Sequence, residues 1–109
     1  QEIVAHLKAS NSEFAQKQLA ALMKLSPLSM AITLEQLRRC ANRSFEDTMT
    51  IEYRMSQRCM QKGHDFFEGV RALLIDKDQK PQWNPPTIEG VTRAMVEEHF
   101  KPVANDLTF

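Results

Sequence analysis

The chain has 109 residues, enough for one domain with one modest core. Its 14 basic and 14 acidic residues cancel, so nucleic acid and anionic membranes are not expected as partners. The hydrophobic fraction of 42% is that of an ordinary globular protein and excludes a chain that is disordered throughout.

The first 42 residues predict three helices in succession. Residues 2–9 carry apolar side chains at helical spacing, and Ser12 then offers a cap for a second helical run over residues 13–25. A third run starts at Pro27, because proline suits the first turn of a helix. The stripe expected to be buried on this third helix is Met30, Leu34, Leu37 and Ala41, with Glu35, Arg38 and Arg39 on the solvent side.

A long fourth helix and a shorter fifth helix are expected next. Ser44, with Asp47 three residues later, is typical of a helix start, and the helix should run to about Gln61 before Gly63 stops it. Its apolar residues lie on two edges, so we expect it to be covered on two sides. Asp65 is predicted to cap the fifth helix. The buried face expected there is Phe66, Val70, Leu73 and Leu74.

The last third of the chain is predicted to be a loop, a helix and a tail. Residues 76–91 form a proline-rich loop, and Trp83 is the only large apolar anchor between Asp76 and Pro86. A final helix is expected over residues 92–100, followed by a loose tail over residues 101–109. Residues 1–109 therefore read as a single all-α domain of five to six helices. Because the chain begins inside an apolar-periodic segment, we expect it to be a fragment of a longer chain.

The spacing of possible metal ligands predicts no metal site. The histidines lie far apart in the sequence without a ligand pair at i+3 or i+4, and no CxxC is present. Asp76 and Asp78 begin like a calcium loop, but Pro81 lies where such a loop needs glycine. The bland interpretation, solvated loop charges, is preferred. The three histidines are His6, His64 and His99.

The two cysteines are interpreted as packed, reduced thiols. Cys40 and Cys59 each lie on an apolar helix face, where core packing is the common role. Folding could bring a cysteine or a serine beside a histidine, and the sequence leaves that open. Pairs of carboxylates occupy exposed-looking positions, where solvation is their usual state. We therefore predict no catalytic residue in this chain.

The least ordinary segment is residues 63–86. Two adjacent aromatic residues follow a predicted helix start, whose N–H groups would be free, and cationic side chains come shortly after. Such a combination could hold an adenine ring and phosphates. The alternative is that the aromatic rings pack internally and the cations are solvated, and composition alone favours that alternative. The side chains in question are Phe66, Phe67, Arg71, Lys77 and Lys80.

Residues 63–78, GHDFFEGVRALLIDKD, resemble the carboxy-terminal signature of the crotonase (enoyl-CoA hydratase/isomerase) superfamily. The end of this string, followed by Pro-x-Trp-x-Pro at residues 81–85, is similar to a branch that hydrolyses acyl-CoA thioesters. Upstream pieces at residues 26–29, 33–37 and 52–57 agree with that branch. The resemblance covers nearly the whole chain from Ala5 to Phe100.

The resemblance implies a parent protein with an amino-terminal core of ββα units that binds acyl-CoA and carries the catalytic groups. It also implies that the helical region covers the active site of the parent and builds subunit contacts. CoA contact is implied for Phe66, Phe67 and Lys77, and more weakly for Arg71 and Lys80. The expected partners are the amino-terminal core of the same chain, acyl-CoA and a second copy of the chain. No cofactor is expected, and a eukaryotic parent is expected in the mitochondrial matrix.

Two rival interpretations stay open. Crotonase-like chains can lose activity and persist as scaffold subunits, for example in a mitochondrial ribosome. A neighbouring activity, hydration of an enoyl-CoA, is the other possibility. The catalytic acids and the oxyanion-hole glycines of the core would distinguish these interpretations from thioester hydrolysis.

Overall fold

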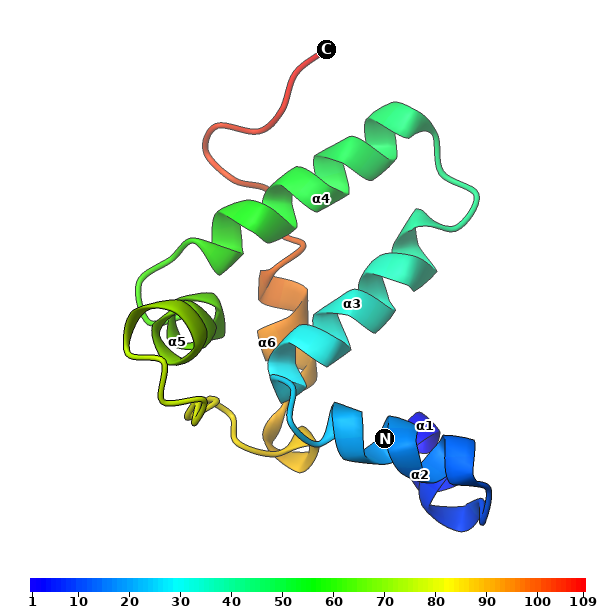
Figure 1. Ribbon diagram of the computed structural model, residues 1–109. Coiled ribbons are helices and arrows are strands. Elements are labelled where there is room, and N and C mark those ends of the chain that lie inside the picture. Colours follow the sequence, from blue (N-terminus) through cyan, green and yellow to red (C-terminus); the bar gives the residue numbers. More distant parts are fainter.

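The computed structural model describes residues 1–109 and contains helices but no strands (Figure 1). The expectation of an all-α piece with five to six helices is confirmed. No helix is both long and apolar enough to cross a membrane. The elements in chain order are α1 (Glu2–Ala9), α2 (Glu13–Leu22), α3 (Pro27–Cys40), α4 (Phe45–Cys59), α5 (Asp65–Val70), the π-helix η1 (Arg71–Ile75), the 3-10 turn η2 (Ile88–Gly90) and α6 (Arg93–Glu98).

Side-chain caps fix where four of these helices start. In each case a hydroxyl oxygen accepts the backbone N–H three residues later, which satisfies one of the unpaired donors of the first turn. These caps confirm the predicted starts at Ser12 and Ser44 and place Pro27 in the first turn of α3. The four capping residues are Ser12, Ser26, Ser44 and Thr92.

The core lies where α6 packs against α3. Leu28 and Ile32 of α3 meet Val96 of α6 and Phe100, and all four are buried. Helix α4 runs back alongside α3 and adds the partly buried Ile51 and Met55 (Figure 1). No residue of α4 is fully buried, and Phe45 at its start is 71% exposed. Residues 48–55 are half-buried, so the expected coverage on two sides is only partial within this chain.

The buried face of α3 differs from the predicted one. Glu35, expected on the solvent side, is only 8% exposed, whereas Leu37 is 66% exposed. Arg39 and Arg93 both donate to the Glu35 carboxylate, so α6 supplies the cation that makes its burial tolerable. The stripe of Met30, Leu34 and Leu37 instead lines an open groove.

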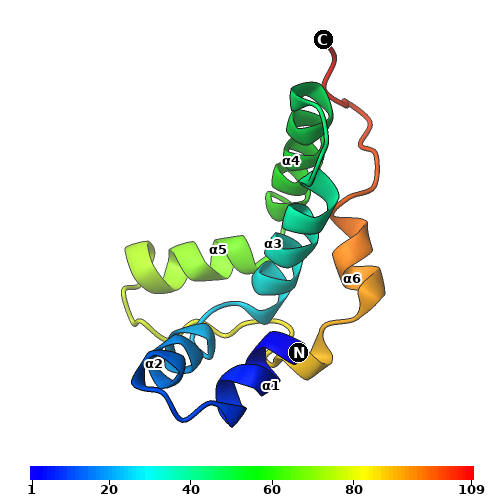
Figure 2. The ribbon, with the colours of Figure 1, turned by 90° about the vertical axis from the view of Figure 1, so that its right-hand side faces the viewer.

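The molecule is flat and thinly packed. Its extents are 47 × 37 × 22 Å, so it is about two helix diameters thick. The radius of gyration is 15.6 Å, whereas a compact domain of this length has about 13 Å. Only 12 of 109 residues are buried. The second view shows why: α5 projects sideways from the α3–α4–α6 group, and α1 and α2 form a separate pair below it (Figure 2).

The proline-rich loop and the tail both contact the helices. The Trp83 indole N–H donates to the Lys24 carbonyl at 3.1 Å, and the ring lies against Gly69 of α5. A Cβ at position 69 would lie 3.2 Å from the indole, so glycine permits this contact. In the tail, the Arg54 guanidinium donates two hydrogen bonds to Asp106. This ion pair attaches the tail to α4. That residues 101–109 are loose stays a prediction.

Candidate functional site

The start of α5 is capped by His64 and not by Asp65. The His64 Nδ1 accepts the Phe66 N–H at 3.0 Å, and the His64 carbonyl accepts the Phe67 N–H. The prediction of free N–H groups at this helix start is therefore wrong for these two groups. Because both donors are satisfied within the chain, the start of α5 is not an open anion site.

Asp65 instead joins three segments. Its carboxylate accepts the Ser26 hydroxyl at 2.6 Å and the Asn84 backbone N–H at 2.9 Å. The Ser26 hydroxyl oxygen in turn accepts the Ser29 N–H at the start of α3. Asp65 is 4% exposed, so these bonds are made away from water. One carboxylate thus ties α5 to α3 and to the loop after η1.

The aromatic pair predicted for ligand contact lies exposed on α5. Phe66 is 48% and Phe67 is 42% exposed. Their rings meet edge to face, with centroids 5.7 Å apart. The predicted buried face of Phe66, Val70, Leu73 and Leu74 is wrong at three positions: Phe66 is 48%, Leu73 52% and Leu74 68% exposed, and only Val70 is half-buried. An apolar face this open is typical of a binding surface.

Of the three cations in the segment, one is held in ion pairs and two are free to bind a ligand. Arg71 pairs with Glu68, Asp76 and Asp78, which raises the pKa of the guanidinium and leaves it no free donor face for a phosphate. Lys77 and Lys80 are exposed and take part in none of the ion pairs. The segment between Phe66 and Lys77 spans roughly 16 Å at helical rise, so the two cannot contact the same ligand group.

Glu68 holds the loop rather than performing chemistry. It receives two hydrogen bonds from Arg71 and one from the Gln82 backbone N–H. These donors, the Arg71 bonds first, lower the pKa of Glu68 to about 2. A carboxylate this acidic is a poor proton acceptor at neutral pH.

A broad apolar groove of about 1420 Å³ runs between α1, α3, α5 and α6. Phe66 and the apolar stripe of α3 (Met30, Leu34 and Leu37) line it, whereas Phe67 and Lys77 do not. More than half of its lining residues are hydrophobic, 16 of 30. The groove therefore joins one predicted ligand contact to the unpaired face of α3.

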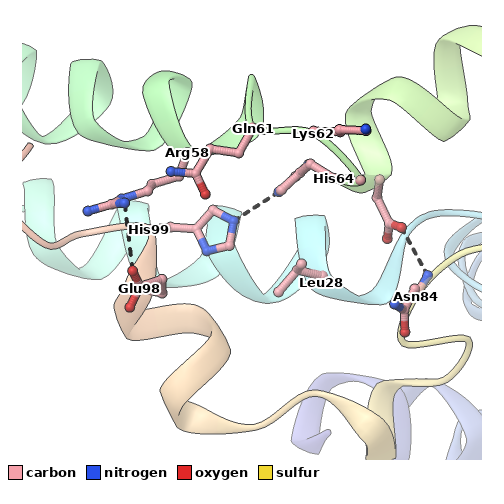
Figure 3. A pocket seen from close by; sticks show the side chains of 10 residues that line it. Leu28, Arg58, Gln61, Lys62, His64, Asn84, Glu98 and His99 are labelled. Carbon is pink, nitrogen blue, oxygen red and sulfur yellow. Dashed lines mark hydrogen bonds and ion pairs between the residues drawn. The ribbon is translucent and has the colours of Figure 1, made fainter.

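A small polar pocket of about 220 Å³ lies where α4, α5 and α6 converge, and it shares only Asp65 with the groove (Figure 3). Its lining includes His64 and His99, whose Nε2 atoms are 2.9 Å apart. The fold thus brings together two histidines separated by 35 positions. Cys59 joins them, with its sulfur and the histidine nitrogens all within 4.8 Å. Sequence spacing gave no signal for this cluster, because its members come from three separate elements.

The hydrogen bonds assign the protons of the histidine pair. The His64 Nδ1 accepts from Phe66, so its Nε2 carries the proton and donates to His99 Nε2. The His99 Nδ1–H then donates to the Met95 carbonyl at 2.8 Å. Burial is the largest cause that lowers the pKa of both imidazoles, so both are neutral at neutral pH. Burial also raises the pKa of the Cys59 thiol.

Charges around this pocket balance. Arg58 and Lys62 line it together with Asp65 and Glu98. The Arg58 Nη1 lies 3.7 Å from Glu98, and its Nε is buried without a hydrogen-bond partner. Both cysteines of the chain are free.

The chain matches the family model described as enoyl-CoA hydratase/isomerase over residues 1–100. It is 54% identical over 106 residues to "3-hydroxyisobutyryl-CoA hydrolase, mitochondrial" of Gallus gallus, which covers 97% of the chain and 27% of that protein. The Homo sapiens protein of the same name is 46% identical, covering 100% of the chain and 28% of that protein. The chain spans about a quarter of the length of these curated relatives.

Two solved structures share the helical arrangement. An enoyl-CoA hydratase from Rhodobacter sphaeroides 2.4.1 superposes with a TM-score of 0.89 at 37% identity, over 99% of this chain and 32% of that one. A carnitinyl-CoA dehydratase from Mycobacterium thermoresistibile gives 0.86 at 39% identity, over 97% of this chain and 30% of that one. Each solved chain is about three times the length of the matched region.

Proposed function

The chain belongs to the enoyl-CoA hydratase/isomerase family, the crotonases, and on that premise we propose that it is the carboxy-terminal helical part of a 3-hydroxyisobutyryl-CoA hydrolase. The parent would cleave the thioester of this acyl-CoA in valine breakdown. Its catalytic groups would lie in the amino-terminal core, since this chain offers no assembled acid, base and oxyanion hole. Mitochondrial relatives with 42–54% identity support this assignment and a matrix location in a eukaryote.

The observation that carries the proposal is the unpaired apolar groove. Its lining includes Met30, Leu34 and Leu37 of α3, which form a regular helical stripe. The chain covers Met30 and Leu34 only in part, and Leu37 is 66% exposed. A stripe of this kind is selected to pack against something, because an exposed apolar face of this size is costly in a soluble monomer. The amino-terminal core of the same chain is the proposed cover, and a second copy of the chain is proposed for part of the remaining exposed surface.

Acyl-CoA contact is proposed for Phe66, Phe67 and Lys77. The two rings are exposed and fixed edge to face, which suits stacking against a flat base. The Lys77 ammonium is exposed and unpaired, so it can meet a phosphate without first breaking an ion pair. Their separation along the segment suits an extended ligand with an aromatic end and an anionic end. Lys80 is a weaker candidate, and Arg71 is engaged by three carboxylates.

The test is release of free CoA from 3-hydroxyisobutyryl-CoA, followed with a thiol reagent. The full-length protein should turn the substrate over, and the 109-residue chain alone should not. Hydrolysis by the chain alone would contradict the placement of the catalytic groups in the core. Inactivity of both would favour the scaffold role, and hydration of an enoyl-CoA by the full-length protein would favour the activity named for the Rhodobacter sphaeroides structure.

The phosphate contact is tested by Lys77→Ala in the full-length protein. Loss of one exposed phosphate contact, about 1 kcal/mol, should raise KM about fivefold with kcat nearly unchanged, because the contact exists in ground and transition states alike. Lys17→Ala, an exposed lysine on α2, is the matched control and should leave KM unchanged. An unchanged KM for Lys77→Ala would exclude the contact.

A further inference from the structure

We propose that Cys59, His64 and His99 form a binding site for a thiophilic divalent metal ion, with Zn²⁺ the best match. The three residues come from the end of α4, the cap of α5 and the cap that ends α6. Their ligand atoms all lie within 4.8 Å of one another. None of the three ligands lines the groove or is one of the proposed CoA contacts.

The ligand set and its spacing fit zinc. Zinc binds thiolate sulfur at about 2.3 Å and imidazole nitrogen at about 2.0–2.1 Å, so neighbouring ligand atoms in a tetrahedral site lie roughly 3.3–3.8 Å apart. The two Nε2 atoms, at 2.9 Å, are about 0.4 Å closer than that range, so the rings must move slightly apart, and the sulfur must move inward by about 1 Å. All three residues occupy ends or caps of helices, where such a movement does not require a helix to shift. Three protein ligands leave a fourth position open for water.

The surroundings orient the ligands. The His99 Nδ1–H donates to the Met95 carbonyl, which holds the ring with Nε2 facing His64. This arrangement, one ring nitrogen on a backbone carbonyl and the other free for metal, is the usual support of a metal-binding histidine. His99 is 6% exposed and Cys59 is partly buried, so the ion would be shielded from competing solvent.

Binding has a defined proton balance and a defined structural cost. The Cys59 thiol loses its proton to solvent, and one S–metal and two N–metal bonds form. His64 must release its Nε2 proton and carry one at Nδ1 instead, which breaks the hydrogen bond that Nδ1 accepts from Phe66. One proton is released overall, so affinity rises with pH. Metal binding would therefore leave the Phe66 backbone N–H at the start of α5 without its hydrogen-bond acceptor.

The same features select against hard cations. The nearby positive and negative side chains balance, and the cluster itself offers no carboxylate oxygen. Mg²⁺ and Ca²⁺ need oxygen ligands, whereas sulfur with imidazole suits Zn²⁺ and Co²⁺. Mg²⁺ is therefore the negative control for the choice of metal ion. Cysteine and histidine residues outside the cluster are the controls for the choice of ligands.

The experiment is titration of metal-stripped full-length protein with Co²⁺, followed by displacement with Zn²⁺. We expect a thiolate-to-cobalt charge-transfer band and the visible bands of a four-coordinate ion, at one equivalent, and their loss when Zn²⁺ is added. Cys59→Ser should abolish the charge-transfer band, and His99→Gln should weaken Co²⁺ binding at least about tenfold. Cys40→Ser and His6→Gln, the residues of the same types outside the cluster, should leave the spectrum unchanged. Circular dichroism of each variant checks that it is folded.

A second measurement keeps the proposal open to refutation if the Cys59 variant fails to fold. In the wild-type protein, Zn²⁺ should shift the Phe66 backbone amide resonance by removing its hydrogen bond to His64, and Mg²⁺ should not. Absence of a charge-transfer band at saturating Co²⁺ would overturn the proposal. So would a band that survives Cys59→Ser but disappears in Cys40→Ser, or a Phe66 amide that ignores Zn²⁺.

Discussion

The α3–α6 junction and the α5–η1 arm are both helical, but only the junction is complete in itself. At the junction, Leu28, Ile32, Val96 and Phe100 bury one another, and Arg39 lies over the Phe100 ring while pairing with Glu35 and Glu97. On the arm, Leu73, Leu74 and Ile75 are 52–71% exposed. The arm is held at its base by Asp65 and at its side by Trp83, and its apolar face has no partner.

This difference separates stability from function along the chain. The junction supplies most of the burial, so it should determine the free energy of unfolding of the 109-residue chain. The arm carries the aromatic pair and leads into Lys77, so the position of the arm should affect ligand binding. The predictions below ask how strictly the two roles are separated.

The largest effect is expected for Ile32→Ala. Ile32 is 3% exposed at the centre of the junction, and truncating such a residue costs about 2–5 kcal/mol. In a core this small, the loss would unfold much of the chain at room temperature. Leu37→Ala, on the same helix but 66% exposed, should change stability by about 0.5 kcal/mol or less. Urea titration measures both. Equal losses would refute the assignment of the buried face.

The next effect is expected for Asp65→Ala, which removes the link between arm and junction. It leaves the buried Ser26 hydroxyl and the Asn84 N–H without their acceptor, at about 2 kcal/mol in total. Hydrogen exchange should then show faster opening of α5 than of α3. Glu89→Ala, an exposed carboxylate in the same half of the chain, is the control. If α3 and α5 lost protection equally, the two regions would be one cooperative unit.

A smaller effect is expected on acidification. The hydrogen bond from Arg39, followed by contacts with Arg93, lowers the pKa of Glu35 below its ordinary value of 4.5. The folded state therefore binds the proton less readily than the unfolded state. The resulting stabilisation is complete above pH 4.5 and is lost as pH falls through the folded pKa. Urea midpoints in the Glu35→Gln variant should fall less between neutral and acidic pH than in the wild type. If the urea midpoint of Glu35→Gln fell with pH as steeply as that of the wild type, Glu35 would not contribute to the acid sensitivity of the fold.

The smallest effect is expected for Leu74→Ala in the chain alone. Leu74 is 68% exposed, so its truncation should change the free energy of unfolding by less than about 0.5 kcal/mol. In the full-length protein the same change should cost about 1 kcal/mol or more if the core covers this face. Equal small effects in both proteins would show that the arm stays uncovered in the parent.

The sequence predicted the helices far better than their faces. Caps and breakers are local, so Ser12, Pro27 and Ser44 marked helix starts correctly. Burial is not local. Leu37 was expected to be buried and Glu35 to be exposed. An apolar period predicts that one helix face is covered, but it does not identify the element or chain that covers it. In this chain α6 brings Arg93 onto Glu35, and the apolar stripe faces the groove.

The same limit applied to the candidate sites. Phe66, Phe67 and Lys77 could be singled out because they are close in sequence, and their proposed CoA contact stays a prediction. The cap at the start of α5 was assigned one residue too late, since histidine is a less common cap than aspartate. The cluster of Cys59, His64 and His99 could not be predicted, because only the packing of α6 brings His99 to the α4–α5 turn.

The contact between Trp83 and Gly69 has a consequence for a cleaved chain. The segment after η1 is attached to the helices on both sides of residues 79–82. Before this stretch, Asp76 and Asp78 pair with Arg71. After it, the Trp83 indole contacts Gly69 of α5 and donates to the Lys24 carbonyl. Proteolysis within residues 79–82 would cut the backbone between these fastenings. The two fragments should therefore remain associated and elute together under native conditions, separating only when denaturant releases the tryptophan.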